Sequence, residues 1–73
     1  MSGTNIDTKR LIRLREERTW SRDLMSKRTG LSPSAIAKIE NGERRPSIST
    51  LALICDALGC EPADLLAPLE ETG

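Results

Sequence analysis

The chain has 73 residues, a formal net charge of zero, 37% hydrophobic and 30% charged residues, and Trp20 as its single aromatic side chain. A chain of this length forms one domain with little room for an enclosed catalytic pocket, and its many Leu, Ile, Ala, Arg and Glu residues predict an all-α fold. Cys55 and Cys60 without any histidine exclude a zinc site, and no apolar run approaches the ~20 residues that a membrane span requires.

The first helix is expected to begin near Asp7, which is an acceptable N-cap, after a frayed segment of residues 1–6. Ile6 and Leu11 flank this N-cap at the spacing of a hydrophobic staple, which supports the same starting point. Trp20 follows the expected end of the helix. We interpret it as a side chain that covers the junction between two helices, in preference to a binding residue.

Two short helical segments joined by a single glycine form the centre of the chain. Ser21 and Ser32 are suitable N-caps for them, and Pro33 fits the first position of the second helix because no hydrogen bond is lost there. Gly30 ends the first segment, where a left-handed backbone conformation is favoured, and Gly42 follows the second. This arrangement predicts a helix-turn-helix, a unit whose second helix can lie in the major groove of DNA.

Two further helices are expected after a short polar loop. The first begins near residues 47–49 and ends before Gly59, which is a suitable C-terminal glycine. The second begins at Pro62, is brief, and is stopped by the proline that opens an acidic tail, residues 68–73. The expected organisation is therefore a frayed N-terminus, one domain over residues 7–67, and this tail.

Apolar residues at helical spacing predict which side chains are buried. The expected core contains Leu11, Leu14, Met25, Leu31, Ile36, Ile39, Ile48, Leu51, Ile54, Cys55, Leu58, Leu65 and Leu66. We expect Leu24 and Leu53 to point outward, where they and Leu69 are either single exposed leucines or part of a surface for a partner protein. Cys55 and Cys60 are interpreted as small core residues in preference to reactive thiols.

Charge is divided unevenly along the chain. Residues 1–45 carry all 11 Lys and Arg and six of the 11 acidic residues, which gives a net charge of +5. Residues 46–73 carry the other five acidic residues and no basic one, which gives −5. Such a division can present a positive face to a polyanion, and a mixed solvated surface is the simpler alternative.

One collinear set of residues matches the pattern of a known family. It comprises Leu14-Arg15-Glu16-Glu17-Arg18, residues 21–32, Ile36, Ile39-Glu40-Asn41-Gly42, Pro46-Ser47 and Ala57-Leu58-Gly59. With these residues the chain resembles, over residues 8–66, the helix-turn-helix domains of the lambda-type phage repressor, or Xre-like, family. The resemblance implies a compact five-helix bundle with a central helix-turn-helix.

The resemblance also implies which residues face DNA. The side chains that would face base edges are Ser32, Pro33, Ser34, Ala37 and Lys38. The residues that would bind backbone phosphates are Ser21 and Arg22 on one side and Asn41, Arg44 and Arg45 on the other. Lysine can donate to guanine O6 and N7, serine can donate or accept, and alanine can contact a thymine methyl group. Because Pro33 and Ala37 offer no side-chain hydrogen bond, we expect recognition to depend more on phosphates and DNA shape than on direct base contacts.

An ion pair within the domain is a further implication of the resemblance. Proteins of this family carry an Arg and a Glu that tie the first helix to the end of the third, and Arg15 and Glu40 stand at the matching positions. We expect a structural role for this pair, in preference to catalysis or ligand binding. The pair would hold the DNA-reading helix in place.

The function implied by the resemblance is that of a sequence-specific transcriptional regulator. The simplest form is a repressor that binds a palindromic double-stranded operator through residues 33–41, as a homodimer at least on DNA. Two alternatives stay open: an antitoxin or protein-interaction module that also regulates its own operon, and a controller protein of a restriction–modification system. No nucleophile motif or phosphate loop points to an enzyme, and no cofactor, metal or membrane partner is expected. The expected location is the cytoplasm, and the nucleoid when DNA is bound.

Overall fold

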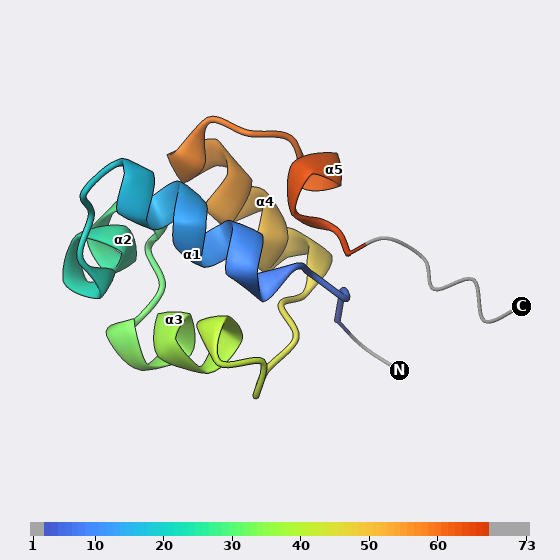
Figure 1. The fold of residues 1–73 in the computed structure, drawn as a ribbon. Helices are drawn as coiled ribbons and strands as arrows, with labels where there is room; N and C mark the ends of the chain where they lie inside the picture. Colours follow the sequence, from blue (N-terminus) through green and yellow to red (C-terminus); the bar gives the residue numbers. More distant parts are fainter. Residues whose placement is uncertain (1–2, 68–73) are drawn as a thin grey trace, which may run out of the picture.

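Five α-helices follow one another in the computed structural model, which describes residues 3–67 (Figure 1). They are α1 (Thr8–Glu17), α2 (Arg22–Thr29), α3 (Pro33–Glu40), α4 (Ile48–Leu58) and α5 (Pro62–Leu65). The described residues contain no β-strand beyond one isolated bridge between Ile6 and Leu66. The all-α class and the helix-turn-helix of α2 and α3 are confirmed, whereas the predicted stop at Pro68 and the acidic tail lie outside the described residues.

Each of the first four helices begins where the sequence provides an N-cap. The cap side chain accepts a hydrogen bond, at 3.1–3.2 Å, from a backbone N–H that the helix itself leaves unpaired. These caps are Asp7, Ser21, Ser32 and Ser47. At the other end, Gly30 and Gly59 close α2 and α4 in the left-handed conformation, with φ angles of 82° and 70°, as predicted.

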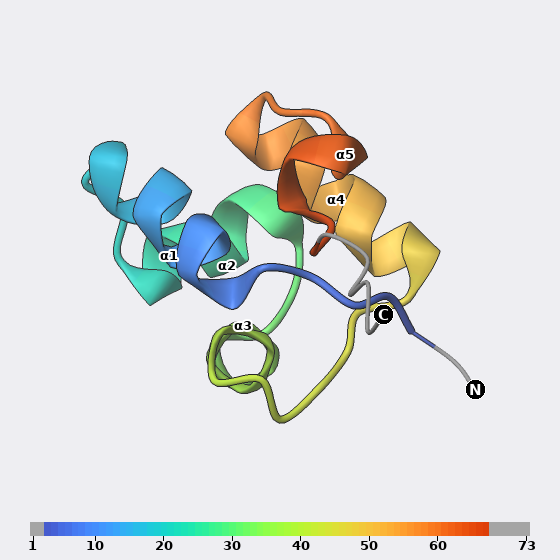
Figure 2. The ribbon, with the colours of Figure 1, turned by 45° about the vertical axis from the view of Figure 1, so that its right-hand side comes forward.

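One hydrophobic core joins all five helices. Its buried members are Leu11, Met25, Ile36, Ile39, Leu51, Ile54, Cys55, Leu58 and Leu65. Ile6, Leu14 and Trp20 are partly buried and pack against it. Burying each large aliphatic side chain stabilises the fold by about 1.5–3 kcal/mol. Helix α3 lies at the edge of the bundle, and Figure 2 shows it end-on with one side turned away from the other helices.

Two core positions predicted from periodicity are wrong, and one surface position is only partly correct. Ile48 is 77% exposed, and Pro46, two residues earlier, is buried in its place. Leu66 is 43% exposed because it follows α5 in extended conformation. Leu65, the last residue of α5, is buried in the core, whereas Leu66 has already left the helix. Leu24, expected to be exposed, is half-buried.

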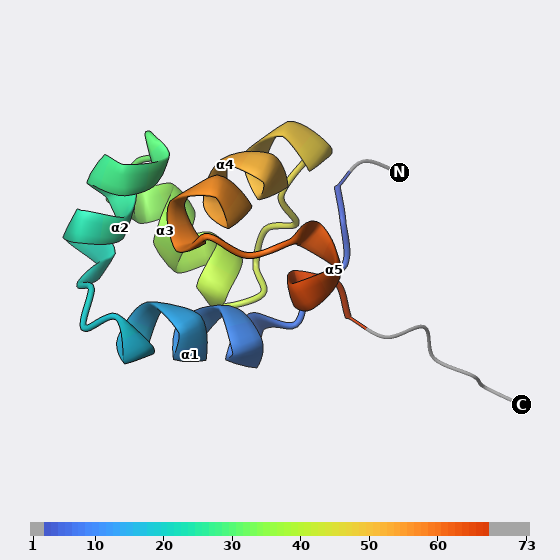
Figure 3. The ribbon, with the colours of Figure 1, turned by 90° about the horizontal axis from the view of Figure 1, so that it is seen from above.

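The N-terminal segment, residues 3–6, runs past α5 on its way to α1 (Figure 3). The Thr4 N–H donates to the Pro46 carbonyl oxygen at 2.7 Å, and the Ala67 N–H donates to the Asn5 carbonyl oxygen at 2.9 Å. The segment therefore joins the loop after α3 to the chain that leaves α5. Fraying was expected for residues 1–6, but residues 4–6 have backbone partners. These partners belong to the loop after α3 and to the chain that leaves α5.

Candidate nucleic-acid interface

The turn between α2 and α3 is held by hydrogen bonds between neighbouring residues. The Gly30 N–H donates to the Ser26 carbonyl oxygen at 2.8 Å, and the Ser26 hydroxyl donates to the Leu31 carbonyl oxygen. The Leu31 N–H donates to Thr29 Oγ1 at 3.2 Å, and this buried hydroxyl in turn donates to the Met25 carbonyl oxygen at 2.8 Å. Because the polar groups of the turn are paired, α3 has a defined direction relative to α2.

Helix α3 presents an outer face that the core leaves free. Ile36 and Ile39 are buried on its inner side, so helical spacing puts Ser34, Ala37 and Lys38 on the outer side. Four of the five residues predicted to face bases are exposed, namely Ser32, Pro33, Ser34 and Lys38, and Ala37 is half-buried. The structure therefore brings these five residues together along the start and the outer face of α3.

The residues predicted to bind phosphates precede and follow α3. They are Ser21 and Arg22 at the start of α2 and Asn41, Arg44 and Arg45 after α3, and all five are exposed. The loop after α3 folds back on the helix, because the Arg44 N–H donates to the Lys38 carbonyl oxygen at 3.2 Å. Glu43 lies in the same loop, where its carboxylate accepts a 3.5 Å hydrogen bond from the Asn41 amide and reduces the local positive charge.

A buried carboxylate connects α1, α2 and α3. The Glu40 side chain is fully buried, and its Oε2 accepts from Arg15 Nε at 2.6 Å while its Oε1 accepts from Arg15 Nη2 at 3.1 Å. Arg22 Nε also donates to Glu40 Oε1, at 2.9 Å. The structure thus brings Arg15 and Glu40 together and adds Arg22, a partner that sequence reasoning missed. No local spacing signals this contact, because the two residues are 18 positions apart.

Two other arginines have structural contacts that the sequence did not reveal. The Arg18 guanidinium donates to the carbonyl oxygens of Leu14 and Leu58, so it caps the C-terminal end of α4. The Arg28 guanidinium lies 5.2 Å from the centre of the Trp20 ring, a cation–π contact at the junction of α1 and α2. Basic residues of the first part of the chain are therefore not all available to a polyanion.

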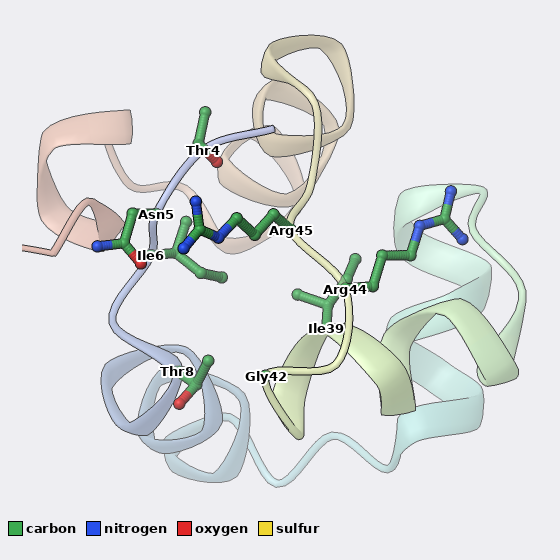
Figure 4. A pocket seen from close by; sticks show the side chains of 8 residues that line it. All are labelled: Thr4, Asn5, Ile6, Thr8, Ile39, Gly42, Arg44 and Arg45. Carbon is green, nitrogen blue, oxygen red and sulfur yellow. The ribbon is translucent and has the colours of Figure 1, made fainter. Parts of the chain in front are cut away.

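A cavity of about 140 Å³ lies between the N-terminal segment, the start of α1 and the loop after α3 (Figure 4). Figure 4 shows the Arg45 side chain extending across it toward Asn5 and Ile6, whereas Arg44 points away. Thr4 and Thr8 also line the cavity, and none of its lining residues is acidic. The Arg45 stem is therefore partly enclosed by the cavity, and its guanidinium lies beside the N-terminal segment.

The two cysteines behave as core residues. Burial, reinforced by the neighbouring Cys60 thiol, raises the pKa of the Cys55 thiol to about 12, so Cys55 is neutral near pH 7. Among residues 3–67, no group of three or more His, Cys, Asp or Glu side chains is arranged to hold a metal ion. No helix in the same part of the chain is both long enough and apolar enough to cross a membrane.

Comparison with known proteins identifies the family of this chain. The model of the HTH_3 helix-turn-helix family matches residues 11–65. The chain belongs to this family. Over 60 residues it is 33% identical to the uncharacterized HTH-type transcriptional regulator y4dJ of Sinorhizobium fredii, a match that covers 82% of this chain and 78% of that protein. The family is one of DNA-binding transcription regulators.

Two solved structures show the same fold. The restriction-modification controller protein C.AhdI from Aeromonas hydrophila has 28% sequence identity and a TM-score of 0.75, with 78% of this chain and 86% of that chain covered. The DNA-binding domain of the P22 C2 repressor has 26% identity and a TM-score of 0.74, with 84% of this chain and 80% of that chain covered. The five-helix architecture is therefore that of the lambda-repressor-like domains.

Proposed function

We propose that this HTH_3 protein is a sequence-specific repressor that binds a palindromic operator as a homodimer through the outer face of α3. The observation that carries the proposal is the outer face of α3, where Ser34 and Lys38 are exposed and Ala37 is half-buried. In the chain, Arg22 precedes this face, and Arg44 and Arg45 follow it. An exposed helix with cations on both flanks fits a major groove lined by phosphates. We place this binding in the cytoplasm, at the nucleoid, with no cofactor.

Base recognition is expected to depend on few side chains. Lys38 can donate to guanine O6 and N7, Ser34 can donate or accept, and the Ala37 methyl group can contact thymine. The remaining specificity would come from the shape and deformability of the operator, because Pro33 presents no hydrogen-bonding side chain. Lys38→Ala should therefore relax the preference at one base pair, at a loss of about 1–3 kcal/mol, in a selection from random duplexes.

Salt dependence tests whether the contact is with a phosphate backbone. With about four to six phosphate contacts per subunit, the logarithm of affinity should fall against log salt with a slope near −4 to −5 per subunit, because each contact contributes about −0.9. Arg44→Ala should weaken all duplexes alike and make the slope less steep by about 0.9. A slope near zero for the wild-type protein would refute the proposal.

Half-site geometry tests the dimer. Two copies related by a two-fold axis require half-sites about 10 bp apart, centre to centre. Binding that follows the second power of protein concentration, and that is lost when the spacing changes by half a helical turn, is the expected result. Equal affinity for a single half-site would exclude the dimer.

A second candidate function is that of a restriction–modification controller. It is favoured by the similarity to C.AhdI, of which this chain covers 86% at a TM-score of 0.75. This role uses the same face of α3 and differs in the genes that are regulated. Selected operators that map upstream of a restriction endonuclease gene would favour it. An autoregulating antitoxin is the third possibility, and co-purification with the product of a neighbouring gene would identify it.

A further inference from the structure

We propose that Glu40 positions the Arg22 guanidinium for a backbone phosphate, so that the free protein already holds one of its phosphate contacts in the binding orientation. The inference rests on the proposed function, because it assigns a role to one contact of the DNA-bound protein. It concerns the half-exposed arginine of the ion-pair cluster formed by Arg15, Glu40 and Arg22.

The two arginines of the cluster differ in how many of their nitrogens are hydrogen-bonded inside the domain. Arg15 is 12% exposed, binds both carboxylate oxygens of Glu40, and donates through Nη1 to the Trp20 carbonyl oxygen at 2.8 Å. All three nitrogens of Arg15 are therefore used inside the domain. Arg22 is 45% exposed and uses Nε on Glu40. Its two Nη atoms make no hydrogen bond to any other described residue.

The two arginines also differ in how far their positive charge is exposed to solvent. One buried carboxylate faces two guanidinium groups, so the cluster carries a net charge of +1. Because Arg15 is enclosed, the surplus positive charge is presented by Arg22 at the surface. The pairing with Glu40 therefore orients Arg22 without cancelling the charge that a phosphate would meet.

The position of Arg22 makes this orientation useful. Arg22 is the first residue of α2 and Glu40 the last of α3, so their contact joins the two helices of the helix-turn-helix. A guanidinium held through Nε presents both Nη groups as a planar fork, which matches two phosphate oxygens. The ammonium group of lysine is a point charge and cannot bind Glu40 through one nitrogen and a phosphate through two others.

Affinity and salt dependence separate orientation from charge. Arg22→Lys keeps the charge, so it should leave the salt slope unchanged while weakening DNA binding about three- to tenfold through loss of the ordered fork. Arg22→Gln removes the charge and should weaken binding further and make the slope less steep by about 0.9. Arg13→Lys is the matched control, because Arg13 is exposed on α1 and has no assigned DNA contact.

A second measurement does not depend on DNA. In the free protein, the Arg22 Nε–H should exchange with water at least several-fold more slowly than the Arg13 Nε–H, as measured by nuclear magnetic resonance, because it donates to a buried carboxylate. Equal exchange rates for Arg22 and Arg13 would overturn the inference. An Arg22→Lys protein that binds DNA like the wild type would also overturn it while leaving the proposed function intact, provided that thermal unfolding shows both proteins folded. A wild-type protein without affinity for any duplex would refute the proposed function and, with it, the phosphate role of Arg22.

Discussion

Replacing Glu40 by glutamine is expected to destabilise the domain strongly. The buried carboxylate accepts three hydrogen bonds from Arg15 and Arg22 and balances their charge. Glu40→Gln removes that charge and turns one acceptor into an amide donor that faces other donors. Breaking a buried ion pair costs about 3–5 kcal/mol, and we expect about 3 kcal/mol here because the half-exposed Arg22 is screened by water.

This loss is large for a domain of 73 residues. Natural domains are stable by about 0.05–0.15 kcal/mol per residue, which for this chain is about 4–11 kcal/mol. A loss of 1 kcal/mol lowers the Tm of a small domain by about 4–8 °C, so Glu40→Gln should lower it by about 12–24 °C. Thermal and urea unfolding followed by far-UV circular dichroism measure both quantities.

Glu43→Gln is the matched control for this substitution. It makes the same chemical change three residues later, at an exposed side chain, and should alter the free energy of unfolding by no more than about 0.5 kcal/mol. Arg15→Gln combined with Glu40→Gln should cost at least about 1 kcal/mol less than the sum of the two single losses, because the two residues are hydrogen-bonded to each other. Equal stabilities of the Glu40→Gln and Glu43→Gln proteins would refute the reasoning.

Two matched pairs of substitutions test the packing by the same unfolding measurements. Gly3 and Gly42 both have positive φ angles, 99° and 79°, but only at Gly3 would a Cβ meet another residue, the Cβ of Arg45 at 2.7 Å. Gly3→Ala should therefore cost about 2 kcal/mol and Gly42→Ala about 1 kcal/mol, and equal losses would show that the N-terminal segment moves aside freely. Ile54→Ala should cost about 2–5 kcal/mol and Ile48→Ala at most about 0.5, and a comparable loss at Ile48 would contradict its exposure.

Helix boundaries were predictable because their signals lie within a few residues of each boundary. Ser21 and Ser32 cap helices through their own hydroxyl groups, and Gly30 and Gly59 adopt the left-handed conformation that other residues rarely take. The exposure of Leu53 was predictable for a similar reason, since it lies opposite the buried stripe of α4. These features need no knowledge of the rest of the chain.

Side chains at the ends of elements were less predictable. Ile48 has the right spacing for the core of α4, yet whether another helix covers the first turn depends on the tertiary arrangement, and there the loop residue Pro46 is buried. The hydrogen bond from Thr4 to Pro46 joins residues 42 positions apart and has no periodic signal. The small polar residues before Asp7 favour a frayed segment when only their local composition is considered, because nothing nearby in the sequence indicates so distant a partner.

The outer face of α3 was predictable from the sequence, whereas the orientation of the Arg22 side chain was not. The first depends on the geometry of one helix, and the second on a contact between two helices. Burial of Ile36 and Ile39 determines by geometry alone which residues of α3 point outward, so the candidate reading surface follows from the sequence pattern. The direction of the Arg22 fork depends on where the end of α3 lies relative to the start of α2. The contact with Glu40 that determines this direction also stabilises the fold, so Arg22→Lys separates the two roles only when its loss of affinity is compared with its loss of stability in thermal unfolding.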